Sequence, residues 1–162
     1  MDMNTGFTPQ FTLDQLYISP FTAERYFDSE TGKALYRPVE RNMSPTGVHL
    51  LDQFLQIMCT SQSYSSSPHA WESRLGVPMS DFTAMCRLLT GMDREQLQEA
   101  IRLRLADDLL RYTDLEMGDI ARRCGYSDYS GLFKLLDKTY KCSVGDRQRH
   151  VRKRGDRGRW RL

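Results

Sequence analysis

The fold of this chain is decided by the stretch Thr113-Asp-Leu-Glu-Met-Gly-Asp-Ile-Ala-Arg-Arg-Cys-Gly-Tyr-Ser-Asp-Tyr-Ser130. Gly125 in its middle suits a left-handed turn, because glycine adopts a positive φ without steric cost. Ser127 is a suitable N-cap for a helix that follows, and Asp128 lies at the positive end of that helix. Ala121 is small enough to let a preceding short helix approach the second one closely. The stretch therefore predicts a helix-turn-helix, in which two short helices pack across a tight turn.

A similar arrangement precedes this stretch, and a long helix joins the two. We expect a short helix from about His69 that Gly76 closes, and a second helix from Pro78 that Gly91 ends. Asp93 is a good N-cap for a long helix over about 94–112. That helix carries an apolar stripe at helical spacing, formed by Leu97, Ile101, Leu105 and Leu109. With a last helix over about 145–152, the prediction is an all-α, homeodomain-like fold of two helix-turn-helix units joined by a linker helix.

The N-terminal part of the chain gives weaker signals. All six prolines lie at or before Pro78, and we expect residues 1–44 to be loosely structured. For residues 45–68 we expect an amphipathic helix that begins at Ser44-Pro45, followed by a polar linker. Apolar side chains at spacings of three and four define its buried face, namely Val48, Leu51, Leu55 and Met58. The double helix-turn-helix domain then covers residues 69–150, and a basic tail covers residues 151–162.

Composition and charge exclude several classes of protein. The chain has 162 residues and a net charge of +2, but residues 147–162 carry eight Lys or Arg against one acidic residue. No apolar run is long enough to cross a bilayer, and the acidic N-terminus has no apolar signal core, so we expect a cytoplasmic location and no membrane partner. The four cysteines are widely spaced and have no histidine at ligand spacing. We therefore expect reduced thiols and no metal.

Residues 71–149 resemble the DNA-binding domain of AraC/XylS-type transcription regulators. The resemblance rests mainly on the second unit, with the pattern Ile120-Ala-x-x-x-Gly125-Tyr-Ser-Asp-x-Ser130, preceded by Arg104-Leu-Ala106 and Thr113-Asp-Leu115. Thr90-Gly-Met92 and Arg102 lie at the matching distance upstream. The resemblance implies a sequence-specific regulator that binds double-stranded DNA mainly through its second unit. We expect no enzymatic activity and no cofactor, and a homodimer or another protein as a candidate partner of the N-terminal region.

The chain departs from the family pattern at several positions. Asp137 stands where a lysine is usual, and the segment Lys141-Cys-Ser-Val-Gly-Asp-Arg-Gln148 replaces the usual Gly-x-Thr-Pro-x-x-Tyr-Arg. Gly131 inside the second helix costs about 1 kcal/mol relative to alanine. In the first unit, Glu72 replaces a small alanine and Pro78 a serine cap. These departures support an alternative, a degenerate helix-turn-helix that binds a protein and contacts nucleic acid without sequence preference.

The resemblance also assigns candidate DNA contacts. In a helix-turn-helix the second, recognition helix enters the major groove, and here that helix is expected over about 128–138. The expected base contacts are Tyr129, Ser130, Phe133 and Lys134 in the second unit, with Ser80 and Thr83 in the first. The expected phosphate contacts are Arg87, Arg122, Arg123, Lys138, Arg149, Arg152, Lys153 and Arg154. For Phe133 a protein interface remains an alternative, and for Lys134 a solvated charge.

Enzymatic chemistry has little support in the sequence. His49, His69 and His150 are scattered, and no glycine-rich phosphate loop precedes a helix. Asp107 and Asp108 are adjacent, but we expect them to lie on a solvated face of the linker helix.

Overall fold

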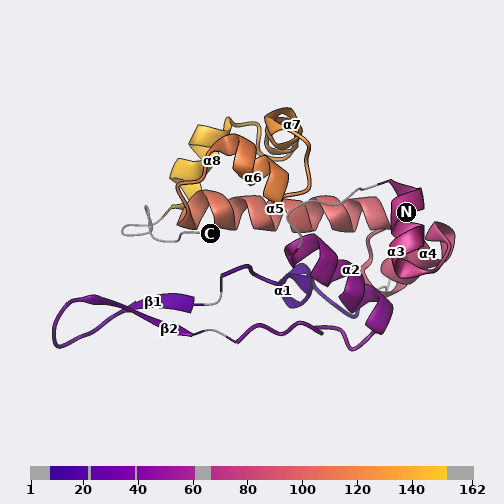
Figure 1. Ribbon diagram of the computed structural model, residues 1–162, viewed down its shortest axis with the longest axis horizontal. Helices are drawn as coiled ribbons and strands as arrows, with labels where there is room; N and C mark the ends of the chain where they lie inside the picture. Colours follow the sequence, from indigo (N-terminus) through magenta and orange to yellow (C-terminus); the bar gives the residue numbers. More distant parts are fainter. Residues whose placement is uncertain (1–7, 22, 39, 61–66, 153–162) are drawn as a thin grey trace, which may run out of the picture.

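The chain folds as a helical body with one projecting β-hairpin (Figure 1). The computed structural model describes residues 8–21, 23–38, 40–60 and 67–152. Two strands, β1 (Ala23–Phe27) and β2 (Ala34–Pro38), form the hairpin. The helices of these ranges are α1 (Leu13–Leu16), α2 (His49–Thr60), α3 (Pro68–Leu75), α4 (Met79–Thr90), α5 (Arg94–Tyr112), α6 (Met117–Arg123), α7 (Tyr129–Tyr140) and α8 (Val144–Val151).

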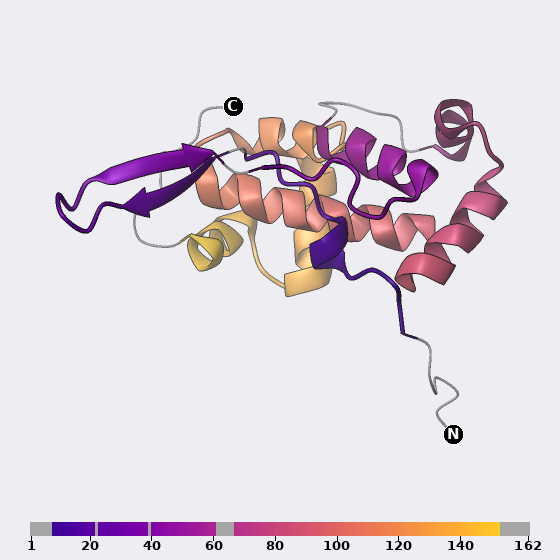
Figure 2. The same cartoon turned by 90° about the horizontal axis from the view of Figure 1, so that it is seen from below.

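The long helix α5 organises the molecule. Its N-terminus carries the expected cap, because the Asp93 carboxylate accepts a hydrogen bond from the Gln96 backbone N–H and the Gln96 side chain returns one to Asp93. Helices α3 and α4 lie at the N-terminal end of α5, and α6, α7 and α8 pack on its C-terminal half. Helix α2 packs on the side of α5 opposite to α6, α7 and α8 (Figure 1), and the hairpin projects beyond one end of α5 (Figure 2). The predicted pair of helix-turn-helix units joined by a linker helix is confirmed.

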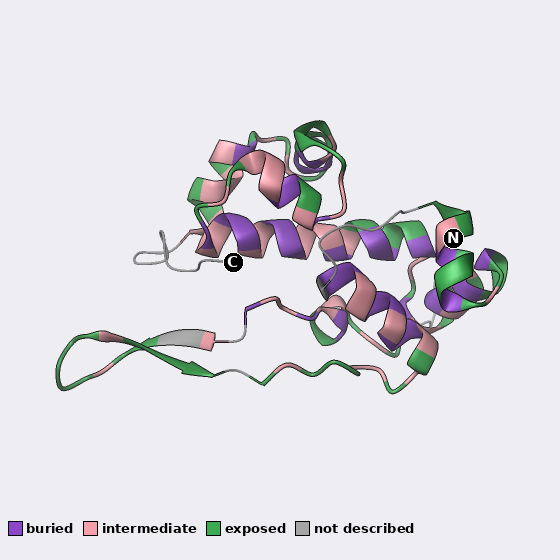
Figure 3. Cartoon of the chain, in the orientation of Figure 1, coloured by how far each residue is buried: buried purple, intermediate pink, exposed green. Residues whose placement is uncertain are grey.

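Two hydrophobic cores share α5. The first core joins α2, α3, α4 and the beginning of α5, and its centre is Phe54, whose ring lies 4.5 Å from Trp71 and 4.9 Å from Phe82 between centroids. The second core joins the rest of α5 with α6, α7 and α8. Burial follows this division, since the inward faces of the helices are buried while the hairpin is largely exposed (Figure 3). The first unit therefore depends on α2, which lies outside the helix-turn-helix pattern.

The N-terminal segment is more ordered than we expected. Leu16, Ile18 and Phe21 are buried against the helical body, and the two strands pair in antiparallel register from Ala23 opposite Pro38 to Phe27 opposite Ala34. The connecting turn uses Asp28, whose carboxylate accepts hydrogen bonds from the Glu30 backbone N–H and the Thr31 hydroxyl. The description of residues 1–44 as loosely structured is therefore wrong for the part that the structure describes.

Helix α2 begins later than its sequence signal suggests. The expected start at Pro45 is wrong, because Gly47 has a φ of 72° and the first helical residue is His49. Thr46 and Asp52 stabilise the turn before the helix. The Asp52 carboxylate accepts hydrogen bonds from the Thr46 backbone N–H at 2.9 Å and from its hydroxyl at 2.7 Å.

Neither a membrane span nor a metal cluster is found in the described ranges. No helix there is long and apolar enough to cross a bilayer. The same ranges hold no group of three or more His, Cys, Asp or Glu side chains that could bind a metal ion.

Candidate nucleic-acid interface

The turn of the second unit has the geometry that the sequence predicts. Gly125 has a φ of 88°, and the backbone N–H of Tyr126 donates to the Ala121 carbonyl at 3.0 Å. Ala121 and Cys124 are buried between α6 and α7. This turn fixes the direction in which α7 leaves α6 and therefore which face of α7 points to solvent.

Helix α7 is capped by Asp128 and not by Ser127, which corrects our expectation. The Asp128 carboxylate accepts hydrogen bonds from the backbone N–H of Ser130 at 2.9 Å and from the Ser130 hydroxyl. The hydrogen bond from the Ser130 hydroxyl is the main cause of a lowered pKa for Asp128. Ser130, an expected base contact, is thus already engaged by the cap of its own helix.

The packing of α7 explains why a glycine stands at position 131 in spite of its low helix propensity. A Cβ atom at this position would lie 2.4 Å from Cδ1 and 2.8 Å from Cγ of Tyr126, closer than real Cβ atoms approach. The Tyr126 ring is in turn covered by Arg102, whose Cζ lies 4.7 Å from the ring centroid. Glycine at position 131 therefore lets α7 pack directly on the turn of its own unit.

Three of the four expected base-contact residues of α7 present exposed side chains on one face of the helix. Tyr129 and Phe133 are 40% and 44% exposed, and their ring centroids lie 6.2 Å apart. Lys134 is exposed on the same helix, and its charge acts on the nearby Asp128 carboxylate. Leu132, Leu135 and Leu136 are buried on the opposite face. The sequence pattern therefore divides α7 correctly into a packed face and a presented face.

The first unit reaches the same shape by a different cap. Pro78 is the N-cap of α4 and offers no side-chain hydrogen bond. Glu72 on α3 supplies the missing acceptor, since its carboxylate accepts a hydrogen bond from the backbone N–H of Met79 at 2.9 Å. The two departures from the family pattern, Glu72 and Pro78, therefore compensate each other.

The presented face of α4 differs in chemistry from that of α7. Ser80 and Ala84 are exposed and Thr83 is half-buried, so its polar side chains are short. Further along the helix Leu88 is 69% exposed. Arg87 is also exposed, and its guanidinium lies 3.8 Å from the Asp93 carboxylate. This face can offer few hydrogen bonds to a base edge.

Several of the expected phosphate contacts form ion pairs at the surface. Lys138 pairs with Glu99 at 3.1 Å, Arg122 with Asp119, and Arg149 with Asp146. Such exposed pairs contribute little free energy, so their cations remain available to another anion. Arg123 is half-buried at the end of α6. Lys153 and Arg154 lie outside the described residues.

Arg152 has a different role from the one we expected. Its guanidinium donates to the backbone carbonyls of Leu110 at 2.8 Å and Thr113 at 2.6 Å, and it lies 3.1 Å from the Asp114 carboxylate. These carbonyls lie at the C-terminal end of α5, where a cation is favoured by the helix dipole. The assignment of Arg152 to phosphate is therefore corrected, because its donors serve the end of α5.

Asp107 and Asp108 are also structural, and the expectation of a solvated face is wrong. Both oxygens of Asp107 accept hydrogen bonds from Arg147, at 2.8 Å from Nε and 2.7 Å from Nη2. Asp108 accepts one from the Tyr17 hydroxyl at 2.8 Å, and burial raises the pKa of this carboxyl. No local sequence signal marks these pairs, because their partners are 40 and 91 residues away.

Comparison with known proteins agrees with this architecture. Residues 71–150 match the model of a family described as a helix-turn-helix domain. No curated protein sequence matches the chain. Three solved structures share the fold at low identity. The DNA-binding domain of AdpA, a global transcriptional factor solved in complex with a target DNA, is 19% identical, with a TM-score of 0.55 over 62% of this chain and 90% of that one.

The other two structures give the same result. The C-terminal domain of AraT, a response regulator from Geobacillus stearothermophilus, is 21% identical, with a TM-score of 0.55 over 62% of this chain and 84% of that one. The xylose-binding transcription activator xylR is 16% identical, with a TM-score of 0.51 over 64% of this chain and 27% of that one. The family model covers the same residues that form the two glycine turns and the linker helix α5. Residues 71–150 of this chain therefore form a helix-turn-helix domain of the AraC type.

Proposed function

We propose that this protein is a transcription regulator that binds specific double-stranded DNA mainly through α7. The observation that carries the proposal is the presented face of α7, where Tyr129, Phe133 and Lys134 are exposed on a helix held rigidly by its buried leucines. A lysine can donate to O6 and N7 of guanine, and a phenylalanine can contact the methyl group of thymine. The AraC-type fold, which AdpA shares in complex with its target DNA, supports this role for the second unit.

Cations around α7 supply the phosphate contacts in this proposal. Lys138, Arg122 and Arg149 exchange their carboxylate partners for phosphates, and Arg87 does the same beside α4. Each phosphate neutralised makes binding more sensitive to salt, with a slope of about −0.9 in log affinity against log salt for each contact. Lys153, Arg154 and the rest of the basic tail add further phosphate contacts in this proposal. We assign Ser80 and Thr83 a smaller part in base recognition, because their side chains are short.

A second candidate function is protein binding by the same face. The exposed pair Tyr129 and Phe133 favours it, since aromatic side chains are enriched at protein interfaces. In that case the cations would give only sequence-independent affinity for nucleic acid. The two functions differ in one measurable property, which is the preference among DNA sequences.

The test is a selection of bound duplexes from a random library at about 0.15 M salt, where non-specific binding is weakened. We expect the wild-type chain to enrich a motif. Lys134→Ala is expected to change the preferred bases at one part of that motif and to lose roughly 5- to 100-fold in affinity for it. Lys33→Ala removes the same charge from the exposed hairpin and should keep the motif unchanged. Enrichment of no motif by the wild type would overturn the proposal in favour of the second candidate.

A further inference from the structure

The β-hairpin gathers more exposed apolar surface than any other part of the described chain. Four large apolar side chains are exposed on its two five-residue strands, namely Tyr26, Phe27, Leu35 and Tyr36. The register places Tyr26 and Leu35 on one face of the sheet, and Phe27 and Tyr36 on the other. The rest of the described residues expose only four such side chains, and they are spread over the segment before α2, α4 and α7. Apolar surface concentrated in this way marks an interaction site.

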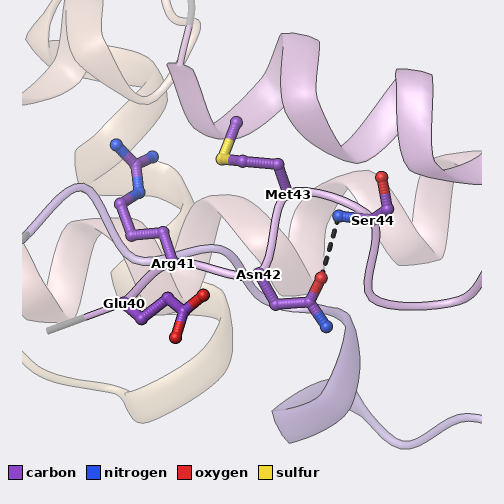
Figure 4. Close-up of a pocket in the computed structure, with 5 residues that line it drawn as sticks. All are labelled: Glu40, Arg41, Asn42, Met43 and Ser44. Carbon is purple, nitrogen blue, oxygen red and sulfur yellow. Dashed lines mark hydrogen bonds between the residues drawn. The ribbon is translucent and has the colours of Figure 1, made fainter.

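The hairpin is held at its base and projects from the body. In the segment that follows β2, the Asn42 side chain accepts a hydrogen bond from the Ser44 backbone N–H at 3.0 Å (Figure 4). Gln56 on α2 donates to the Met43 carbonyl of the same segment. Within the described ranges the sheet consists of β1 and β2 alone. A two-stranded sheet is only marginally stable in water, and further strands on an apolar face stabilise it.

The turn of the hairpin determines which residues of β2 face its outer edge. The Asp28 backbone N–H donates to the Lys33 carbonyl at 3.0 Å, so Lys33 faces β1. Because inward and outward residues alternate along an antiparallel strand, Ala34, Tyr36 and Pro38 direct their backbone groups away from β1. Pro38 has no N–H and is tolerated at such an outward position of an edge strand. The edge of β2 therefore presents a donor at Ala34 and only an acceptor at Pro38.

We propose that β2 pairs with β2 of a second copy of this chain, so that two hairpins form one four-stranded antiparallel sheet. With a two-fold axis at Tyr36, the Ala34 N–H of each copy donates to the Pro38 carbonyl of the other. The missing N–H of Pro38 is not needed in this register. Tyr36 faces Tyr36 of the second copy on one side of the sheet, and Leu35 faces Arg37 on the other. Aromatic pairs and an arginine stem on a leucine are favourable cross-strand neighbours.

Charge favours a second copy over a nucleic acid as the occupant of this edge. Residues 23–38 carry three Lys or Arg and three acidic residues, so the hairpin has no net charge to attract phosphates or to repel its own copy. Arg37 is the only charged residue of β2, and in the proposed register it does not face itself. Its guanidinium lies over the Tyr26 ring of its own hairpin, 5.6 Å from the centroid. No two like charges therefore meet where the two β2 strands pair.

The position of the hairpin leaves the second unit accessible. Figure 1 shows the hairpin below α5 and α7 above it. A dimer formed through β2 therefore does not cover the presented face of α7. Two-fold symmetry of the protein predicts an inverted repeat in the bound DNA, but this consequence alone rests on the proposed function.

The test measures self-association without DNA, so its outcome is independent of the proposed function. Two short strands bury less than the roughly 1,200–2,000 Å² of a stable complex, so we expect a weak dimer with a micromolar dissociation constant. Sedimentation velocity of the full chain between about 5 and 500 µM would detect an association of this strength. A wild-type chain that stays monomeric over this range would overturn the proposal.

A pair of proline substitutions tests which edge is used. Ala34→Pro removes the N–H that faces the second copy but no hydrogen bond between β1 and β2. We expect it to raise the dissociation constant roughly 10- to 100-fold. Ala23→Pro makes the same change at an outward position of β1 and should leave the dimer unchanged. Circular dichroism would establish that both variants are folded, and equal effects of the two on association would contradict pairing through β2.

Charges placed on the two-fold axis test the register. Tyr36→Lys and Tyr36→Glu should each abolish the dimer when alone, because like charges then face each other. An equimolar mixture of the two should form a heterodimer, since residue 36 of one copy faces residue 36 of the other. Tyr36→Phe keeps the aromatic pair and should dimerise like the wild type. A mixture that associates no better than its separate components would show that the dimer does not form about Tyr36.

Discussion

The two helix-turn-helix units of this protein have the same architecture but are stabilised by different residues. In the second unit, α6–α7, Asp128 caps α7 from within its own sequence. In the first unit, α3–α4, the position before α4 is Pro78, and Glu72 from α3 supplies the acceptor. A shared shape therefore does not require shared caps, provided that each orphan N–H finds an acceptor.

The units also differ in what surrounds them. The core of the first unit is completed by α2, through Phe54 between Trp71 and Phe82. The second unit is completed by α8. Arg147 of α8 pairs with Asp107 of α5, and Arg152, directly after α8, donates a hydrogen bond to the Leu110 carbonyl near the end of α5. The surface chemistry follows the same division, since α7 presents aromatic side chains and a lysine while α4 presents short ones. In our proposal the second unit reads DNA and the first is mainly its structural partner.

The largest expected effect comes from removing the centre of the first core. Phe54→Ala should lower the free energy of unfolding by about 3–5 kcal/mol, because it leaves a cavity between Trp71 and Phe82. Urea denaturation followed by circular dichroism would measure it. Phe27→Ala is the matched control, since Phe27 is 62% exposed on the hairpin and its loss should change stability by less than about 0.5 kcal/mol. Equal losses in the two variants would contradict the dependence of the first unit on α2.

An intermediate effect is expected from two glycines of the second unit. Gly131→Ala should destabilise the protein by about 1–3 kcal/mol, because the new Cβ would overlap the Tyr126 ring. Gly118→Ala on α6 should instead stabilise it by up to about 1 kcal/mol. There a Cβ meets only the flexible end of Arg122, at 3.5 Å, and alanine is the better helix former. Thermal denaturation of both variants would compare them, and a stabilising Gly131→Ala would refute the close packing of α7 on its turn.

The smallest effect is expected in the labelling of buried thiols, and it compares the two units directly. Burial raises the pKa of Cys86 in the first core and of Cys124 in the second to about 12, so both should react slowly at pH 8 while the partly exposed Cys142 reacts first. Mass spectrometry after timed labelling with iodoacetamide would follow each thiol.

In the Phe54→Ala variant we expect the labelling of Cys86 to accelerate more than that of Cys124. Cys86 belongs to the same core as Phe54, and local opening of that core exposes it. Equal acceleration of both thiols would show that the two cores open together through α5.

The sequence by itself determined the helices and the turns of the two units and of the linker helix between them. The Asp93 cap with Gln96, the glycines at 76, 91 and 125, and the apolar stripe of α5 all act within one or two turns of their own position. Such signals are local, so they can be recognised before the chain is folded. They were sufficient for two units, a linker helix and the presented face of α7.

Only the tertiary structure decided the roles of residues whose partners are distant in sequence. Asp107 and Arg147 are 40 residues apart, and Tyr17 and Asp108 are 91 apart. The two strands of the hairpin have only five residues each, which is too short for a clear sequence pattern. Gly131 and Tyr126 are close in sequence, but their contact depends on how α7 packs on the turn before it. A charge or a glycine carries no local mark of its partner, because that pairing exists only once the chain has folded.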